Sequence, residues 1–237
     1  MPFGLSNAPN TFMQVMNQVL TALRKHKLYA ATKKCSFCTD KVLFLGYVIT
    51  KEGIKVDESK IDALRTWPSP STLTKAKAFH GFASFYRHFI KNFSTIVALI
   101  TDCLKTGNFI WTEEVERSFH DIKHKLMTTT ILSLPDFTKT FEVHTDASKV
   151  GVGAVLSQQG RSVAYFSEKL GGSKLRYSTY ELEFYVIVQT FNHWRHYLIH
   201  GAFFLYTDYD ALKYTGQQDS IRPRHSQWSN YLQELPS

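Results

Sequence analysis

The sequence predicts a mixed α/β and α+β fold, in which helices flank a sheet of antiparallel and parallel strands. Three short runs rich in β-branched and aromatic residues, 141–145, 152–157 and 162–167, are expected to form an antiparallel meander. A helix over 178–198 then leads to a fourth strand that ends at residue 207. Strands before and after a crossover helix are typical of a mixed sheet.

The composition indicates a globular chain with an uneven distribution of charge. Of its 237 residues 43% are hydrophobic, and no apolar run approaches membrane-spanning length, so we expect a soluble, intracellular protein without membrane contact. Residues 1–134 carry 18 Lys and Arg against 10 Asp and Glu, whereas residues 135–237 carry 10 against 10. The net charge of +8 therefore lies in the first part. This distribution indicates a basic module that attracts a polyanion, and the alternative is a basic surface that is simply exposed to water.

The first half predicts short elements joined by turns. Residues 11–23 have the apolar spacing of an amphipathic helix, and residues 42–56 predict a hairpin interrupted by Gly46. A short helix over 57–67 is expected to end at the Pro-Ser-Pro-Ser linker of residues 68–71.

A helix over residues 73–93 is the most distinctive prediction in the basic part. Apolar residues recur there near helical spacing, so one side is expected to be buried. The cations on the other side would follow a phosphate backbone, in which case affinity would fall steeply with salt. An ordinary packed helix whose cations face water is the alternative. The candidate nucleic-acid-binding residues on this helix are Lys75, Lys77, Arg87 and Lys91.

The helix predicted over residues 111–127 carries its own boundary signals. Thr112 is a candidate N-cap, two glutamates follow it, and two lysines lie near the helix end, an order that complements the helix dipole. The helical pattern breaks at residues 133–136, and we place the boundary of the second domain there.

Three carboxylates are expected to meet at one edge of the sheet. Asp146 ends the first strand of the meander, Asp208 ends the fourth strand, and Glu183 lies on the helix between them. Carboxylates that lie so close together repel each other unless a cation neutralises them, and hard oxygen ligands select Mg²⁺ or Mn²⁺. These residues are therefore candidate metal ligands and catalytic groups.

Several motifs, taken in order, resemble a known family. Ty3/gypsy-type retrotransposon polyproteins, in which reverse transcriptase runs into ribonuclease H, are similar to this chain over nearly its whole length. The motifs that carry the resemblance are TDAS at 145–148, GVGAVLSQ at 151–158, VAYFSEKL at 163–170, HWRHYL at 193–198 and LYTD at 205–208.

The resemblance implies three segments. These are a reverse transcriptase palm remnant over residues 1–67, thumb and connection helices over 68–134, and a ribonuclease H-like domain over 135–237. Family members place a Tyr-x-Asp-Asp strand-turn-strand between two helices that are joined directly here, after Leu20. The acids of that hairpin hold the metals for polymerisation, so no RNA-directed DNA polymerase activity is expected from this chain.

For ribonuclease H, the resemblance assigns Asp146 to the carboxylate that bridges two metals, Glu183 to the helix acid and Asp208 to the acid of the fourth strand. Glu183 is preferred to Glu181 because the family's Asp-Lys-Glu-Leu sequence lies over residues 181–184. Ser148 of the TDAS motif joins the candidate nucleic-acid contacts. The implied reaction is two-metal hydrolysis of the RNA strand of an RNA–DNA hybrid, with Mg²⁺ or Mn²⁺ as cofactor.

The resemblance also leaves alternatives open. The family's fourth carboxylate is expected beyond the last residue of this sequence, so the ribonuclease H-like domain is interpreted as truncated. A non-catalytic nucleic-acid-binding remnant and a non-functional relic are the alternative interpretations.

Two further sets of residues are poor candidates for metal ligands. Cys35 and Cys38 have C-x-x-C spacing, but no second pair stands at a matching distance for zinc. His193, His196 and His200 share a helix face, and the family pattern HWRHYL indicates a structural helix end there.

Overall fold

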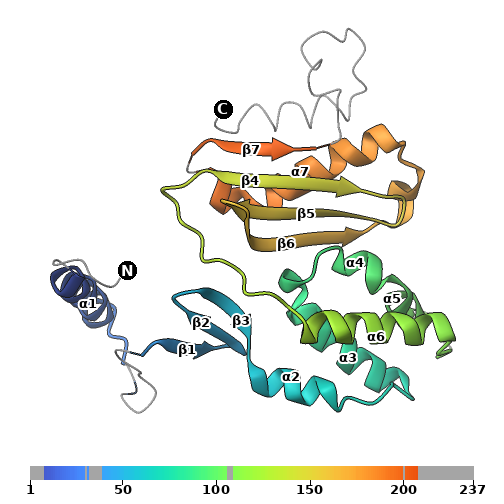
Figure 1. The fold of residues 1–237 in the computed structure, drawn as a ribbon, viewed down its shortest axis with the longest axis horizontal. Coiled ribbons are helices and arrows are strands. Elements are labelled where there is room, and N and C mark those ends of the chain that lie inside the picture. Colours follow the sequence, from blue (N-terminus) through green and yellow to red (C-terminus); the bar gives the residue numbers. More distant parts are fainter. Residues whose placement is uncertain (1–7, 30, 32–38, 106–108, 200, 208–237) are drawn as a thin grey trace, which may run out of the picture. The chain divides into compact units, whose positions relative to one another are not determined.

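The computed structural model describes residues 8–29, 31, 39–105, 109–199 and 201–207, and the chain divides into two compact units, Met1–Val42 and Leu43–Ser237. In the first unit, α1 (Ala8–Lys25) is one uninterrupted helix that ends with two basic residues (Figure 1). It begins at Ala8 rather than at Thr11, and no strand-turn-strand interrupts it after Leu20.

The predicted hairpin is confirmed. It is part of a three-stranded sheet in the order β1 (Lys41–Phe44), β2 (Tyr47–Thr50) and β3 (Gly53–Val56). The antiparallel strands β2 and β3 form the hairpin itself. Leu45 and Gly46 both have positive φ and form the turn between the first two strands. Gly46 therefore occupies a conformation in which a residue with a β-carbon would be strained.

The helices that follow the hairpin have clear N-terminal signals. α2 (Glu58–Arg65) and α6 (Glu113–Met127) start after Asp57 and Thr112, whose side chains accept backbone amides of the first turn. These helices and the elements between them bury one apolar cluster, which includes Phe79, Ile100, Phe119 and Ile122. The intervening elements are α3 (Leu73–Phe85), η2 (Arg87–Phe89), α4 (Phe93–Ile96) and α5 (Ala98–Lys105).

The prediction of one continuous helix from residue 73 to residue 93 is wrong beyond α3. Tyr86 leaves the helical conformation, and the chain continues as η2 and α4. Long-range hydrogen bonds explain the break: the Tyr86 hydroxyl donates to the carbonyl of Gly46 at 3.2 Å, and the Arg87 guanidinium donates to the carbonyl of Ser167. Because these partners are distant in the sequence, the local apolar spacing does not reveal them.

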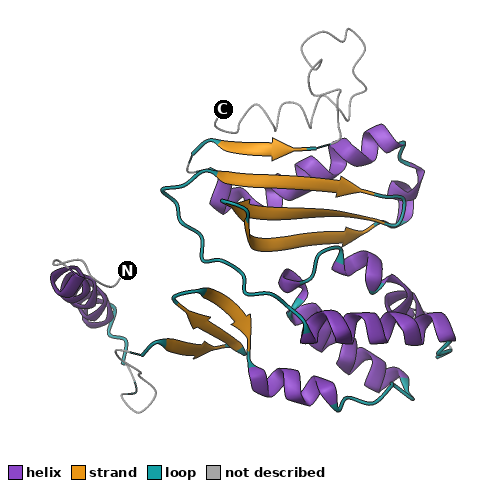
Figure 2. Ribbon diagram, in the orientation of Figure 1, coloured by secondary structure: helices purple, strands orange, loops and turns teal. Residues whose placement is uncertain are grey.

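The mixed sheet is confirmed, in the order β6-β5-β4-β7 (Figures 1 and 2). The first three strands form the antiparallel meander, and the fourth pairs parallel with the first of them. Gln159 and Gly160, both at positive φ, form the tight turn inside the meander. The strands are β4 (Phe141–Ala147), β5 (Gly151–Gln158), β6 (Arg161–Lys169) and β7 (Phe203–Tyr206).

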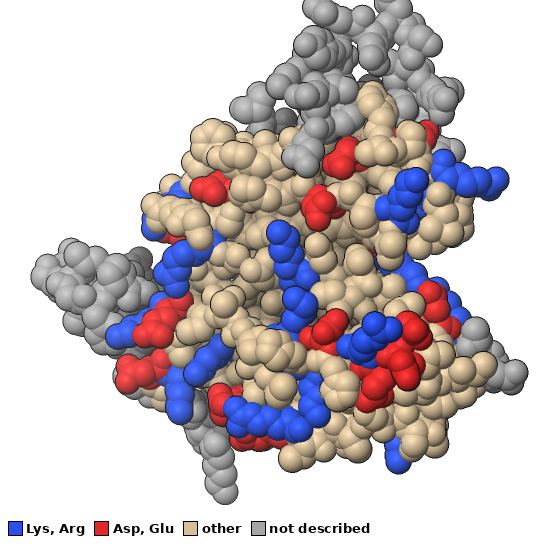
Figure 3. Space-filling model, turned by 45° about the vertical axis from the view of Figure 1, so that its right-hand side comes forward, with Lys and Arg blue, Asp and Glu red and all other residues tan. Residues whose placement is uncertain are grey.

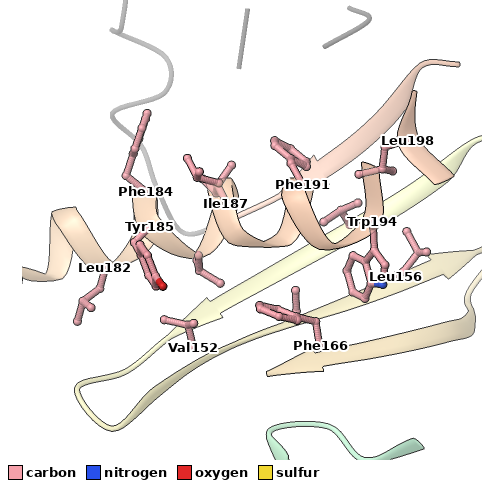
Figure 4. Packing of buried hydrophobic residues seen from close by; sticks show 14 of the residues in the cluster. Val152, Leu156, Phe166, Leu182, Phe184, Tyr185, Ile187, Phe191, Trp194 and Leu198 are labelled. Carbon is pink, nitrogen blue, oxygen red and sulfur yellow. The ribbon is translucent and has the colours of Figure 1, made fainter. Parts of the chain in front are cut away.

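The crossover helix α7 (Thr179–Leu198), preceded by the short η3 (Gly172–Arg176), covers one face of this sheet. Figure 4 shows its first turns beside Val152 and its later turns beside Leu156. The helix is kinked at Trp194 (φ −106°, ψ 19°), whose buried indole packs against Phe166. No helix in the described part of the chain is long and apolar enough to span a bilayer.

Candidate active site

Asp146 is the next-to-last residue of β4 and lies on the face of the sheet away from α7. Ala147 packs against the cluster under α7, and successive strand residues point to opposite faces. Asp146 pairs with Gly153 of β5, which pairs with Ser167 of β6, so the three form one row across the sheet. The Asp146 side chain is exposed, and within the described ranges no Lys, Arg or His forms an ion pair with it.

Glu183 lies near the start of α7, at the same end of the sheet. The Tyr185 hydroxyl donates to Glu168 of β6 at 2.9 Å, and Glu168 pairs with Val152, the residue opposite Ala147 at the end of β4. This contact fixes the first turns of α7 over the end of the sheet where β4 finishes. The half-buried Glu183 and the exposed acid of β4 therefore lie at one end of the sheet and on opposite faces of it.

The neighbouring acid, Glu181, has a structural role. It is the third residue of α7, and its carboxylate accepts hydrogen bonds from the backbone amide of Ser178 at 2.9 Å and from the Ser178 hydroxyl at 3.1 Å. The Ser178 hydroxyl in turn accepts the amide of Glu181, which completes a capping box. This role in the cap argues against Glu181 as a metal ligand.

Asp208 lies outside the described residues, but the register of the strands before it is clear. β7 is parallel to β4, and Tyr206 pairs with His144, so the carboxyl ends of the two strands lie at the same end of the sheet. In the sequence, Asp208 comes two residues after Tyr206, just as Asp146 comes two residues after His144.

The chemistry of the described acids suits a hard cation. Asp146 and Glu183 supply only oxygen ligands, as Mg²⁺ and Mn²⁺ require. Among the described residues no group of three or more His, Cys, Asp or Glu could hold a metal ion. A shared site for Asp146, Glu183 and Asp208 therefore stays a prediction.

The face that carries Asp146 is partly covered by α4. The Ser94 amide donates to the Ser167 hydroxyl at 3.0 Å, and the Ser94 hydroxyl donates to the Ser167 carbonyl at 2.9 Å. Asn92, just before α4, places its amide nitrogen 3.4 Å from a carboxylate oxygen of Asp146. Sequence reasoning did not single out Asn92, because no local motif links it to Asp146.

The three lysines predicted to bind nucleic acid are exposed. Lys75 donates to the Ser71 hydroxyl at 3.1 Å, and none of Lys75, Lys77 and Lys91 forms an ion pair within the ranges that the structure describes. On the face seen in Figure 3, Lys and Arg alternate with Asp and Glu and form no continuous basic patch. The lysines are available to a phosphate backbone, and their binding role stays a prediction.

The other two predicted contacts have internal partners. Arg87 is half-buried and donates to the carbonyl of Ser167, and its burial lowers the pKa of its guanidinium from the usual value. The Ser148 hydroxyl donates to the carbonyl of Gly151 at 2.7 Å and shapes the turn between β4 and β5. Both side chains therefore stabilise the fold, and a role for them in nucleic-acid binding stays a prediction.

A cavity of about 400 Å³ lies between the hairpin, η2, β6 and α7. His88 and His193 stack beside it with ring centroids 6.2 Å apart, and His196 also lines it. Burial is the main cause that lowers the pKa of both stacked rings, which favours neutral imidazoles. The third histidine of the set, His200, and the two cysteines of the C-x-x-C pair lie outside the described residues.

Comparisons with known proteins agree with this fold. Residues 111–205 match the family described as the RNase H-like domain found in reverse transcriptase. The retrovirus-related Pol polyprotein from transposon 297 of Drosophila melanogaster is 32% identical over 99% of this chain. The corresponding polyprotein from transposon gypsy of the same organism is 30% identical over 92%. The chain spans about a quarter of the length of these relatives, 25% and 22% respectively.

A solved structure supports the same assignment at the level of the fold. The foamy viral protease-reverse transcriptase in complex with an RNA/DNA hybrid matches with a TM-score of 0.77 and 21% identity, over 94% of this chain and 32% of the viral one. Residues 111–205 therefore belong to the RNase H-like domain family found in reverse transcriptase, and the chain is homologous to Pol polyproteins of Ty3/gypsy-type transposons.

Proposed function

We propose that this chain hydrolyses the RNA strand of RNA–DNA hybrids at a divalent-cation site formed by Asp146, Glu183 and Asp208. The observation that carries the proposal is the position of the two described acids. Asp146 is exposed near the end of β4, and Glu183 lies on α7 at the same end of the sheet. The third acid follows β7, which runs parallel to β4.

The residues of the chain would bind and orient the reacting groups. Bound Mg²⁺ or Mn²⁺ would supply charge stabilisation at the phosphate and lower the pKa of the attacking water. Asp146 would offer carboxylate oxygens from the face of the sheet opposite α7, and Glu183 would offer its own from the side of α7. A cation that meets both would lie around the end of β4, where the scissile phosphate would have to enter.

An RNA–DNA hybrid is the substrate that the comparisons favour. The foamy viral protease-reverse transcriptase, which shares this fold, is bound to an RNA/DNA hybrid in its solved complex. The exposed lysines Lys75, Lys77 and Lys91 would contribute phosphate contacts from the helical part of the same unit. Such contacts carry little sequence information, which suits an enzyme that degrades hybrids of any sequence.

Cleavage of a hybrid labelled separately on each strand tests the proposal. In the presence of Mg²⁺ we expect products from the RNA strand only, and no cleavage by Asp146→Asn or Glu183→Gln. Glu181→Gln is the matched control, because it alters a neighbouring acid of the same helix that serves the cap. Wild-type protein as inert as Asp146→Asn, or both equally active, would refute the proposed activity.

A non-catalytic nucleic-acid-binding role is the second candidate, favoured by the exposed lysines and by the net charge of +8. It predicts salt-dependent binding of hybrid or duplex without cleavage in any divalent cation. Binding measured at low salt in the presence of a chelator, beside the cleavage assay, separates the two functions. Primer extension by this chain is not expected under either of them.

A further inference from the structure

We propose that Asn92 is a positioning residue for Asp146, so that the cation site of the RNase H-like domain is completed by the helical part that precedes it. This inference rests on the proposed function, because it concerns how one of the proposed ligands is held. Asn92 lies 54 positions before Asp146 in the sequence.

The backbone conformation of Asn92 is unusual and specific. Its φ of 56° and ψ of 31° are left-handed, a region that glycine and asparagine enter more readily than other residues. Asn92 also occupies the N-cap position of α4, where an asparagine usually accepts a backbone amide of the first turn. Here its side chain makes no such bond. The amide group is instead directed at the carboxylate of Asp146, 3.4 Å away.

The cap that Asn92 does not provide comes from the sheet. The Ser167 hydroxyl of β6 accepts the amide of Ser94 in the first turn of α4, at 3.0 Å. Lys169, at the end of the same strand, donates to the carbonyl of Ala98 at 3.1 Å. These contacts fasten α4 and the start of α5 to β6, so Asn92 is held over the sheet rather than free to move.

The sheet is also shaped to receive Asn92. Gly153, the partner of Asp146 in the β4–β5 register, has no β-carbon, and one placed there would lie 2.5 Å from the side-chain oxygen of Asn92. Gly151 makes room in the same way for Thr95, whose hydroxyl oxygen would lie 2.9 Å from an added β-carbon. The two glycines of β5 thus let α4 approach the strand beside Asp146.

The arrangement has a simple chemical consequence. The Asn92 amide donates to one carboxylate oxygen of Asp146, which leaves the other oxygen available to a cation. A carboxylate held in one orientation loses less conformational freedom when the cation binds, so affinity rises without a new ligand.

Divalent-cation affinity of the full chain, measured by calorimetry with Mn²⁺ alone, tests this role. The informative variant is Asn92→Gly, because glycine accepts the left-handed backbone whereas alanine would add strain. We expect its Mn²⁺ affinity to fall about 2- to 10-fold, in line with the net contribution of one typical hydrogen bond. Gly153→Ala should weaken binding similarly, because its new methyl group displaces the Asn92 side chain.

Ser94→Ala is the matched control in the same segment. It removes two hydrogen bonds between α4 and β6, both made by the Ser94 hydroxyl, so it should lower the melting temperature and leave the Mn²⁺ affinity of the folded protein unchanged. Asn92→Gly with wild-type affinity, or an affinity lowered equally by Ser94→Ala, would overturn the positioning role. Wild-type protein that binds no Mn²⁺ would overturn the proposed function, and the role of Asn92 with it.

Discussion

The attachment of α4 to the sheet predicts a large effect for a very conservative substitution, Ser167→Ala. The Ser167 side chain is 2% exposed, and its hydroxyl accepts the backbone amide of Ser94 at 3.0 Å. That amide belongs to the first turn of α4, where no intrahelical acceptor exists, and the N-cap residue Asn92 supplies none. Alanine would leave the amide buried without an acceptor, a loss of about 1–3 kcal/mol in the free energy of unfolding.

The reciprocal variant, Ser94→Ala, gives the comparison. It removes the Ser94 hydroxyl, which donates to the Ser167 carbonyl at 2.9 Å. That carbonyl still accepts a hydrogen bond from Arg87. The Ser167 hydroxyl loses the Ser94 hydroxyl as an acceptor at 3.1 Å but still accepts the amide of residue 94. We expect a loss of about 0.5–1 kcal/mol, clearly below that of Ser167→Ala.

Urea unfolding of both variants, with thermal melts beside it, measures the difference. For a chain of this size 1 kcal/mol corresponds to about 2–4 °C, so Ser167→Ala should melt roughly 2–12 °C below the wild type. The slope of the urea transition should stay unchanged, because neither variant alters the surface exposed on unfolding. Ser167→Ala as stable as Ser94→Ala would show that the sheet does not cap α4, and the reasoning would fail.

The remaining predictions separate stability from chemistry. Glu181→Ala should lower the free energy of unfolding by about 0.5–2 kcal/mol through loss of the capping box and leave hybrid cleavage intact, whereas Glu183→Gln should abolish cleavage with little change in the urea midpoint. His88 and His193 have lowered pKa values, so the folded state disfavours their protonation. Stability should therefore be full above about pH 6.5 and fall as the pH drops below it, and a double substitution by Phe should flatten this profile in urea titrations from pH 8 to 5. Lys91→Gln should reduce the slope of log affinity for hybrid against log salt by about 1, and an unchanged slope would exclude a phosphate contact there.

Local signals in the sequence identify much of the fold. Thr112 and Ser178 are the N-cap residues of α6 and α7, and both helices begin close to their predicted starts. These starts are predictable because the capping hydroxyl and the amide it accepts lie only a few residues apart in the sequence. The turn at Gln159 and Gly160 is also predictable, since two consecutive residues with positive φ suit a two-residue hairpin. The mixed sheet follows from the order of its strands.

Contacts between distant residues are the part that the sequence does not show. The helix predicted through residue 93 breaks after Phe85, because Tyr86 and Arg87 find partners on the hairpin and on β6. Asn92 has no motif that would mark it, and its contact depends on the absence of a β-carbon at Gly153. The domain boundary near residue 135 and the grouping of the three acids stay predictions.

Localisation of a bound cation tests the central claim most directly, which is that acids from β4 and α7 share a divalent ion. Mn²⁺ broadens the NMR signals of nearby nuclei, so its position can be read from the amide spectrum during a titration. The proposed site predicts saturable broadening at the end of β4 and in the first turns of α7 together, both lost in Asp146→Asn. Broadening at only one of the two elements, or none that saturates, would contradict a shared site.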